Sequence, residues 1–189
     1  WRRAIYGQMG VIETRDQAVA ARELRLRPYV DSARVGIWGW SYGAFMSLNA
    51  LFQHPEIYRT AVAVSPVTNW KLYDNVYTER FNGLITDNEA GYERGSPITY
   101  VKGLRGNLLL VHGGGDDNVH YQNSEILINA LVAANKPFTM MEYPNRTHCL
   151  CQGKNTTLHL FTLITRFLDQ NLKGPGDATA GVARASTGP

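Results

Sequence analysis

The chain has 189 residues, 44% of them hydrophobic, and its formal net charge is only +3. This length and composition suit one domain with one sizeable core. There is no long basic run and no apolar stretch of membrane-spanning length, so the sequence predicts neither a nucleic-acid-binding surface nor a transmembrane helix. The chain opens at Trp1 rather than at methionine, which suggests a piece of a longer protein.

Cysteine and histidine usage gives no indication of a metal centre. Cys149 and Cys151 are separated by one residue, and neighbours this close rarely pair with each other, so we predict no disulfide framework. None of the five histidines has the partner spacing of a zinc site. The sequence therefore predicts neither a metal nor a cofactor.

The first third of the chain contains two predicted helices and one strand. Residues 1–16 are polar and interrupted by glycines, so we expect them to be irregular. A helix is predicted over residues 17–28, with Asp16 as its N-cap. A short apolar strand at 35–38 leads into a serine flanked by glycines, and apolar residues at helical spacing follow it.

Strands and helices continue to alternate beyond this point. Residues 60–65 form a continuous apolar run, which is typical of a strand in a parallel sheet covered on both faces. Residues 66–100 are rich in aromatic side chains and lack a clear period, so we expect a functional insertion. The remaining predicted elements are strands at 107–112 and 138–143, helices at 121–135 and 156–172, and a disordered tail at 174–189.

This alternation predicts an α/β fold with a mostly parallel sheet and flanking helices. Active sites of such sheets lie at the carboxyl ends of the strands. Ser41 follows the first strand, Asp116 and Asp117 follow the third, and His148 follows the fourth. We therefore expect these side chains to meet at one edge of the sheet, with either aspartate as the partner of the histidine.

The residue types at this edge favour nucleophilic catalysis. Ser41 lies between Gly39 and Gly43, and such a G-x-S-x-G turn presents a strained serine at the start of a helix. Imidazole can remove the serine proton near neutral pH, and a carboxylate can fix the imidazole tautomer. The order serine, aspartate, histidine is that of the α/β-hydrolases.

Three longer motifs carry a family resemblance. The runs GWSYG at 39–43, YDNVYTER at 73–80 and HGGGDDNVH at 112–120 resemble the catalytic domain of the dipeptidyl peptidase IV branch of the prolyl oligopeptidase family of serine peptidases. The resemblance extends over about residues 3–173. It implies that residues 1–173 are the carboxyl-terminal part of an α/β-hydrolase peptidase domain, incomplete at its amino end.

The resemblance also implies individual roles. Ser41 would be the nucleophile and His148 the base. Asp116, rather than Asp117, would be the acid of the triad, and the backbone N–H of Tyr42 would bind the oxyanion. The pocket for a penultimate proline would be lined by Val67, Trp70, Tyr73, Tyr77 and Val119, with Asn118 binding a substrate carbonyl. Aromatic faces and small aliphatic groups suit a flat pyrrolidine ring.

The chain departs from the family pattern in two places, and parts of the family's architecture are missing. Ala44 replaces a glycine, and the Cys-Leu-Cys run at 149–151 follows the histidine, where small or aliphatic residues are usual. The family places a β-propeller, an oxyanion tyrosine and the first sheet strands ahead of this segment. We therefore expect an exposed sheet edge and little peptidase activity from the 189 residues alone.

The sequence thus predicts a serine exopeptidase that releases X-Pro or X-Ala dipeptides from peptide amino termini through an acyl-enzyme. Its partners would be peptides with penultimate proline or alanine, and the resemblance implies a homodimer and an extracytoplasmic location. The alternatives are another hydrolase of the family, such as an acylaminoacyl peptidase or esterase, and an inactive relative that acts as a binding subunit.

Overall fold

The computed structural model describes residues 3–174, so all but the first residue of the predicted tail lies outside the described residues. Within that range, no helix combines the length and apolar character needed to cross a membrane. The elements are α1 (Ile12–Arg25), β1 (Gly36–Trp40), α2 (Tyr42–Gln53), β2 (Thr60–Val64), η1 (Trp70–Leu72), α3 (Asn75–Asn82), α4 (Ile85–Gly95), η2 (Pro97–Gly103), β3 (Asn107–Gly113), α5 (Gln122–Ala133), β4 (Thr139–Tyr143) and α6 (Thr156–Leu172).

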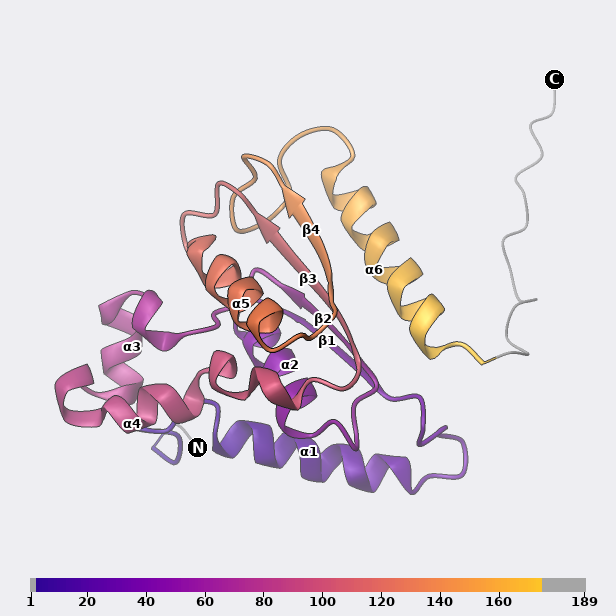
Figure 1. Cartoon of the computed structure of the whole chain (residues 1–189), viewed down its shortest axis with the longest axis horizontal. Helices are drawn as coiled ribbons and strands as arrows, with labels where there is room; N and C mark the ends of the chain where they lie inside the picture. Colours follow the sequence, from indigo (N-terminus) through magenta and orange to yellow (C-terminus); the bar gives the residue numbers. More distant parts are fainter. Residues whose placement is uncertain (1–2, 175–189) are drawn as a thin grey trace.

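The four strands form one parallel sheet in the order β1-β2-β3-β4 (Figure 1). This confirms the predicted α/β class. Within the described residues, β1 has no partner on its outer side. The side chain of Trp38 on this strand remains 48% exposed, in line with the expected open sheet edge.

Helices cover both faces of the sheet. Ala61 and Ala63 of β2 pack into a core shared with α1, α2 and α5. Val62 and Val64, which alternate with them, pack instead against α6 on the opposite face. Figure 1 shows α6 alone on its side of the sheet. Burial on both faces explains why the strand is apolar from Ala61 to Val64.

Helix α1 begins five residues earlier than predicted. It starts at Ile12, so Asp16 lies inside the helix and is not its N-cap. The start is fixed by contacts around Gly10, whose φ is +84°. The Gly10 N–H donates to Glu13 Oε2 at 2.9 Å, and the Thr14 hydroxyl donates to the Gly10 carbonyl at 2.5 Å. Two polar side chains thus position the first turn, which the apolar period alone did not indicate.

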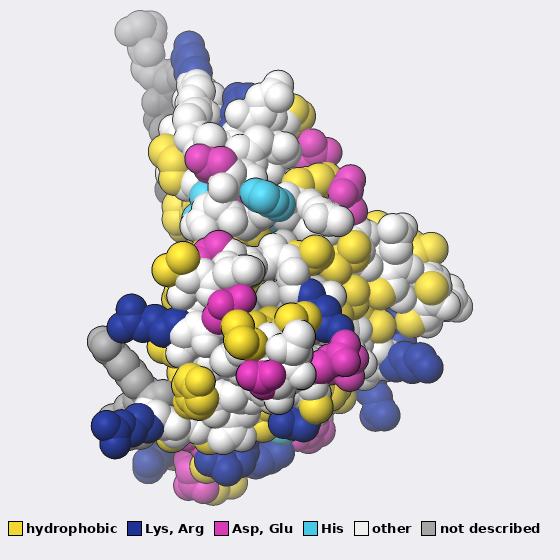
Figure 2. Space-filling model, turned by 90° about the vertical axis from the view of Figure 1, so that its left-hand side faces the viewer, with side chains coloured by type: hydrophobic (Ala, Val, Ile, Leu, Met, Phe, Trp, Pro, Cys, Tyr) yellow, Lys and Arg dark blue, Asp and Glu magenta, His cyan; other side chains and the backbone are white. Residues whose placement is uncertain are grey.

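The region 66–100 is mainly helical rather than irregular. Asp74 caps α3 by accepting the Tyr77 N–H at 2.8 Å, and Gly83 ends the helix at a φ of 75°. Asn88 interrupts α4 with a non-helical backbone, which obscures its period. Hydrophobic residues such as Val76 and Leu84 are exposed, and Figure 2 shows hydrophobic side chains gathered on this side of the molecule.

Candidate active site

The serine turn has the strained geometry that its sequence predicts. Ser41 joins β1 to α2 with a φ of 57° and a ψ of −118°. Its N–H donates to the Val64 carbonyl at 2.9 Å, and its own carbonyl accepts the Phe45 N–H at 3.0 Å. Because Tyr42 is the first residue of α2, its backbone N–H has no intrahelical acceptor and is available to a substrate oxyanion.

The two glycines of the turn differ in their packing. A Cβ at Gly39 would lie 2.2 Å from the backbone carbon of Gly43, so only glycine fits where strand and helix meet. A Cβ at Gly43 would have no atom within 4 Å. Packing therefore requires the first glycine and leaves room for a side chain at the second.

We expect Gly39→Ala to destabilise the fold by about 1–3 kcal/mol or more, because the added methyl group meets rigid backbone. Gly43→Ala is the matched control, and its free energy of unfolding should change by less than about 1 kcal/mol. Urea denaturation of both variants measures the difference. Equal losses at the two positions would contradict the packing argument.

Asp116 lies at the carboxyl end of β3 and contacts His148. Asp116 Oδ2 accepts a hydrogen bond from His148 Nδ1 at 2.8 Å. Oδ1 accepts the backbone N–H groups of Asn118 at 3.0 Å and Val119 at 2.9 Å. The Asp116 side chain is fully buried, whereas Asp117 is exposed. The geometry therefore distinguishes the two aspartates that sequence spacing left open.

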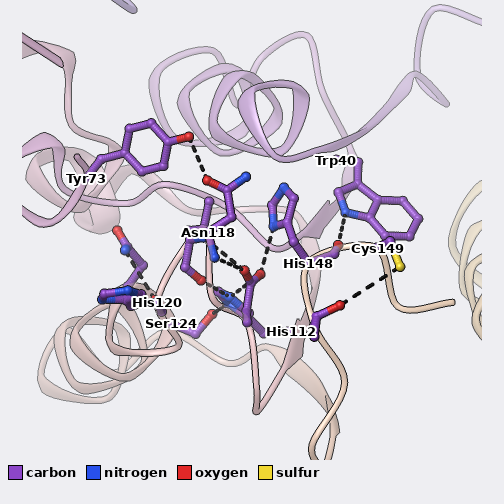
Figure 3. Close-up of polar contacts among 12 residues, drawn as sticks. Trp40, Tyr73, His112, Asn118, His120, Ser124, His148 and Cys149 are labelled. Carbon is purple, nitrogen blue, oxygen red and sulfur yellow. Dashed lines mark hydrogen bonds and ion pairs between the residues drawn. The ribbon is translucent and has the colours of Figure 1, made fainter. Parts of the chain in front are cut away.

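A second histidine, His112, also contacts the Asp116 carboxylate, and it is buried (Figure 3). His112 Nε2 lies 2.8 Å from the Val119 carbonyl and 3.2 Å from Asp116 Oδ2. Both groups are acceptors, so Nε2 carries the proton. The other ring nitrogen, Nδ1, lies 2.7 Å from the Ser124 hydroxyl and forms a hydrogen bond with it. His112 is fully buried and adds a donor to Asp116, while His148 is the histidine with partial exposure.

These donors determine the charge state of Asp116. Burial alone would raise the pKa of its carboxyl group. Hydrogen bonds from His112, from His148 and from the Asn118 backbone outweigh burial and hold the pKa well below its usual range. The carboxylate therefore stays ionised across the neutral range and can stabilise a protonated His148.

A hydrogen bond between a side chain and the backbone links β1, the strand before Ser41, to His148. Trp40 Nε1 donates to the His148 carbonyl at 3.0 Å, and Trp40 directly precedes Ser41. The part of the chain described shows no hydrogen bond between the Ser41 hydroxyl and His148. Catalytic hydrogen bonds are often long before substrate binds, so this geometry does not conflict with a Ser41–His148 pair.

The prediction that the two cysteines do not pair was wrong. Cys149 and Cys151 form a disulfide, with their Cα atoms 5.2 Å apart. The intervening Leu150 has a φ of 45° and is fully buried in the core beneath α6. This left-handed residue turns the backbone so that the neighbouring side chains can meet. The disulfide thus lies in the loop that directly follows His148.

The predicted pocket residues gather beside the serine turn. Tyr73 donates its hydroxyl to Asn118 Oδ1 at 2.9 Å (Figure 3), and Val119 is buried in the same aromatic cluster as Trp70. A cavity of about 140 Å³ is lined by Ser41, Tyr42, Val67, Trp70, Tyr73 and Tyr77. The structure therefore places residues of the expected insertion around the same cavity as Ser41.

Two residues at the site were not assigned a site role from the sequence. Glu13 lies in the segment expected to be irregular, yet it accepts the Tyr42 hydroxyl at 2.6 Å. His112 was expected only to pack or bond locally, and it also contacts Asp116. The position of His112 at the end of a predicted strand, four residues before Asp116, could have indicated it. No sequence pattern indicates Glu13.

Comparisons with known proteins agree with this geometry. The Prolyl oligopeptidase family matches residues 1–175. Prolyl endopeptidase FAP of Homo sapiens is 41% identical over 170 residues, which is 88% of this chain and 22% of that protein. Dipeptidyl peptidase family member 1 of Caenorhabditis elegans is 44% identical over 177 residues, covering 90% of this chain and 21% of that protein. The chain thus spans about a fifth of these relatives.

Solved structures show the same likeness. The crystal structure of Porphyromonas gingivalis dipeptidyl peptidase 4 superposes with a TM-score of 0.89 at 45% sequence identity, covering 91% of this chain and 24% of that one. With the family matched over almost the whole sequence, the chain belongs to the prolyl oligopeptidase family of peptidases.

Proposed function

We propose that the chain carries the catalytic residues of a serine dipeptidyl peptidase, which releases X-Pro or X-Ala dipeptides from peptide amino termini. The observation that supports this most is the 2.8 Å contact between buried Asp116 and His148 at the edge of the sheet where Ser41 turns. An aromatic cavity beside Ser41 supports the proposed substrate class.

In the proposed mechanism, Ser41 Oγ attacks the carbonyl carbon of the penultimate residue while His148 Nε2 takes the hydroxyl proton. The Tyr42 N–H stabilises the oxyanion that forms. His148 then gives its proton to the departing amine as the C–N bond breaks, which leaves an ester on Ser41. Water hydrolyses this ester by the same route, and Asp116 keeps its negative charge throughout.

The cavity supports a small apolar residue next to the scissile bond. Its volume of about 140 Å³ and its aromatic walls suit a pyrrolidine ring or a methyl group. Asn118 uses its carbonyl oxygen to accept from Tyr73, which leaves its NH₂ group to donate to a substrate carbonyl. Recognition of the substrate's free amino group is assigned to residues outside this chain, as the family resemblance implies.

The test uses the longest natural polypeptide that contains these residues, hereafter the parent polypeptide, alongside the 189 residues alone. We expect the parent to hydrolyse Gly-Pro-p-nitroanilide much faster than acetyl-alanine-p-nitroanilide or p-nitrophenyl acetate. The shorter chain should show little turnover. Preference for the acylated amide or the ester would favour another hydrolase of the family, and failure of the parent to label with a fluorophosphonate would favour an inactive relative.

A further inference from the structure

Glu13 connects the first turn of α1 to the aromatic cavity. Its Oε1 accepts the Tyr42 hydroxyl at 2.6 Å, and its Oε2 accepts the Gly10 N–H at 2.9 Å. Both carboxylate oxygens are therefore used, which fixes the side chain. Gly10 is itself held against α2, since a Cβ there would lie 2.5 Å from the ring of Phe45. Glu13 is thus a rigid acceptor rather than a mobile surface charge.

Tyr42 is the residue through which Glu13 could affect catalysis. Its ring lies 5.0 Å from Phe45 and 6.0 Å from Trp70, measured between centroids, and it forms one wall of the cavity. Its backbone N–H is the proposed oxyanion donor. Any movement of this residue would therefore change both substrate binding and stabilisation of the transition state.

The Tyr42 hydroxyl stays protonated in this setting. Burial raises the pKa of the phenol far above its usual value, and the hydrogen bond and negative charge of Glu13 raise it further. The phenol therefore remains a neutral donor at neutral and moderately alkaline pH. Its acceptor, Glu13, is not among the residues that line the cavity.

We infer that Glu13 is a positioning residue, which keeps the Tyr42 hydroxyl out of the cavity so that the cavity offers an aromatic face to the substrate. This inference rests on the proposed function and deepens it. It attributes the preference for an apolar penultimate residue of the substrate to Glu13, which does not itself line the cavity. The Tyr73 hydroxyl likewise has a fixed acceptor, the carbonyl oxygen of Asn118.

Without Glu13 as acceptor, the Tyr42 ring would no longer have a fixed orientation, and its hydroxyl could form a hydrogen bond inside the cavity. A polar group there favours substrates that can hydrogen-bond to it over those that cannot. Gly-Pro and Gly-hydroxyproline substrates differ by one hydroxyl group and therefore report on this change. Loss of Glu13 should reduce the preference for proline as well as the rate.

The experiment is a double-mutant cycle in the parent polypeptide. Glu13→Met removes both acceptors at similar length, and Tyr42→Phe removes the hydroxyl alone. We expect Glu13→Met to lower kcat/KM for Gly-Pro-p-nitroanilide by about tenfold and to lower the ratio of Gly-Pro to Gly-hydroxyproline turnover. In the Tyr42→Phe background, the same change should alter kcat/KM and the ratio by less than about twofold.

A merely structural role would give a different pattern. Glu13→Met would then lower kcat/KM by the same factor with and without the Tyr42 hydroxyl, and the substrate ratio would stay constant; this result would overturn the inference. Glu23→Met, at an exposed position of the same helix, is the control and should change neither quantity. If Glu13→Met fails to fold, Glu13→Gln, which keeps one acceptor, should show the same coupling with a smaller loss.

The rate of fluorophosphonate labelling separates this inference from the proposed function, because it requires no peptide substrate. Coupling between Glu13 and Tyr42 in the labelling rate, without turnover of Gly-Pro substrates, would retain the positioning role and reject the dipeptidyl peptidase. If the protein turns over Gly-Pro substrates but the effects of the two substitutions are additive, the dipeptidyl peptidase function would stand and the positioning role of Glu13 would be rejected.

Discussion

Replacing Ser41 with alanine in the parent polypeptide is expected to lower kcat for Gly-Pro-p-nitroanilide by about a million-fold, because serine, histidine and aspartate act as a unit. KM should change little, since the cavity walls remain. The fold should also persist: the strained backbone of the turn is fixed by hydrogen bonds of the Ser41 N–H and carbonyl, which alanine keeps.

Three measurements check this expectation together. Steady-state kinetics give kcat, fluorophosphonate labelling reports the nucleophile, and thermal denaturation reports the fold. His120→Ala, at an exposed histidine of the loop after Asp116, is a control that should leave all three unchanged. An unfolded Ser41→Ala protein or one that retains most of its activity would each count against Ser41 as the nucleophile.

Asp116→Asn should lower kcat by about 10⁴-fold with little loss of binding. Asp116 Oδ2 accepts from His148 Nδ1 and lies 3.2 Å from His112 Nε2, so it faces two protonated nitrogen atoms. Asparagine has one oxygen for two sets of donors: if that oxygen stays with the Asn118 and Val119 N–H groups, its NH₂ group faces the histidines and favours the wrong tautomer of His148. Asp117→Asn changes an exposed carboxylate next to it and should have almost no effect.

The same substitution should change how stability depends on pH. The pKa of Asp116 is lower in the folded protein than its unfolded value of about 3.9. Its contribution to stability is therefore complete above about pH 4 and is lost as the pH falls toward the folded pKa. In urea denaturation between neutral pH and about pH 3, the free energy of unfolding should fall less with decreasing pH for Asp116→Asn than for Asp117→Asn. The opposite ranking would contradict the assignment.

The sheet and the placement of the triad candidates could be predicted because each depends on a local rule. Runs of mostly apolar residues located β2 and β3 to within one residue, since the middle of each strand is buried on both faces. The contact of Asp116 with His148 at the edge of the sheet where Ser41 turns follows from parallel strand direction. Neither inference requires knowledge of a particular side-chain contact.

The remaining features depend on contacts between distant segments or on unusual backbone. The first turn of α1 is positioned by Glu13 and Gly10, and Glu13 also binds Tyr42, 29 residues away. The Cys149–Cys151 disulfide requires a buried leucine with positive φ between the cysteines, which residue spacing does not indicate. Helices α3 and α4 have short or interrupted periods; α3 is defined by its Asp74 cap and by Gly83, whereas α4 has no side-chain cap and is broken at Asn88.

The hydrogen bond from the Trp40 indole to the His148 carbonyl is one that the proposed reaction does not break. Neither the indole N–H nor the peptide carbonyl of His148 gains or loses a proton near neutral pH, so in the proposed mechanism their bond persists whether or not the imidazole holds the serine proton. The loop carrying His148 would thus remain in register with β1 through the proposed acylation, hydrolysis and product departure. The alignment of this loop therefore does not depend on the hydrogen bond between the His148 imidazole and the reacting group, which each proposed turnover would break.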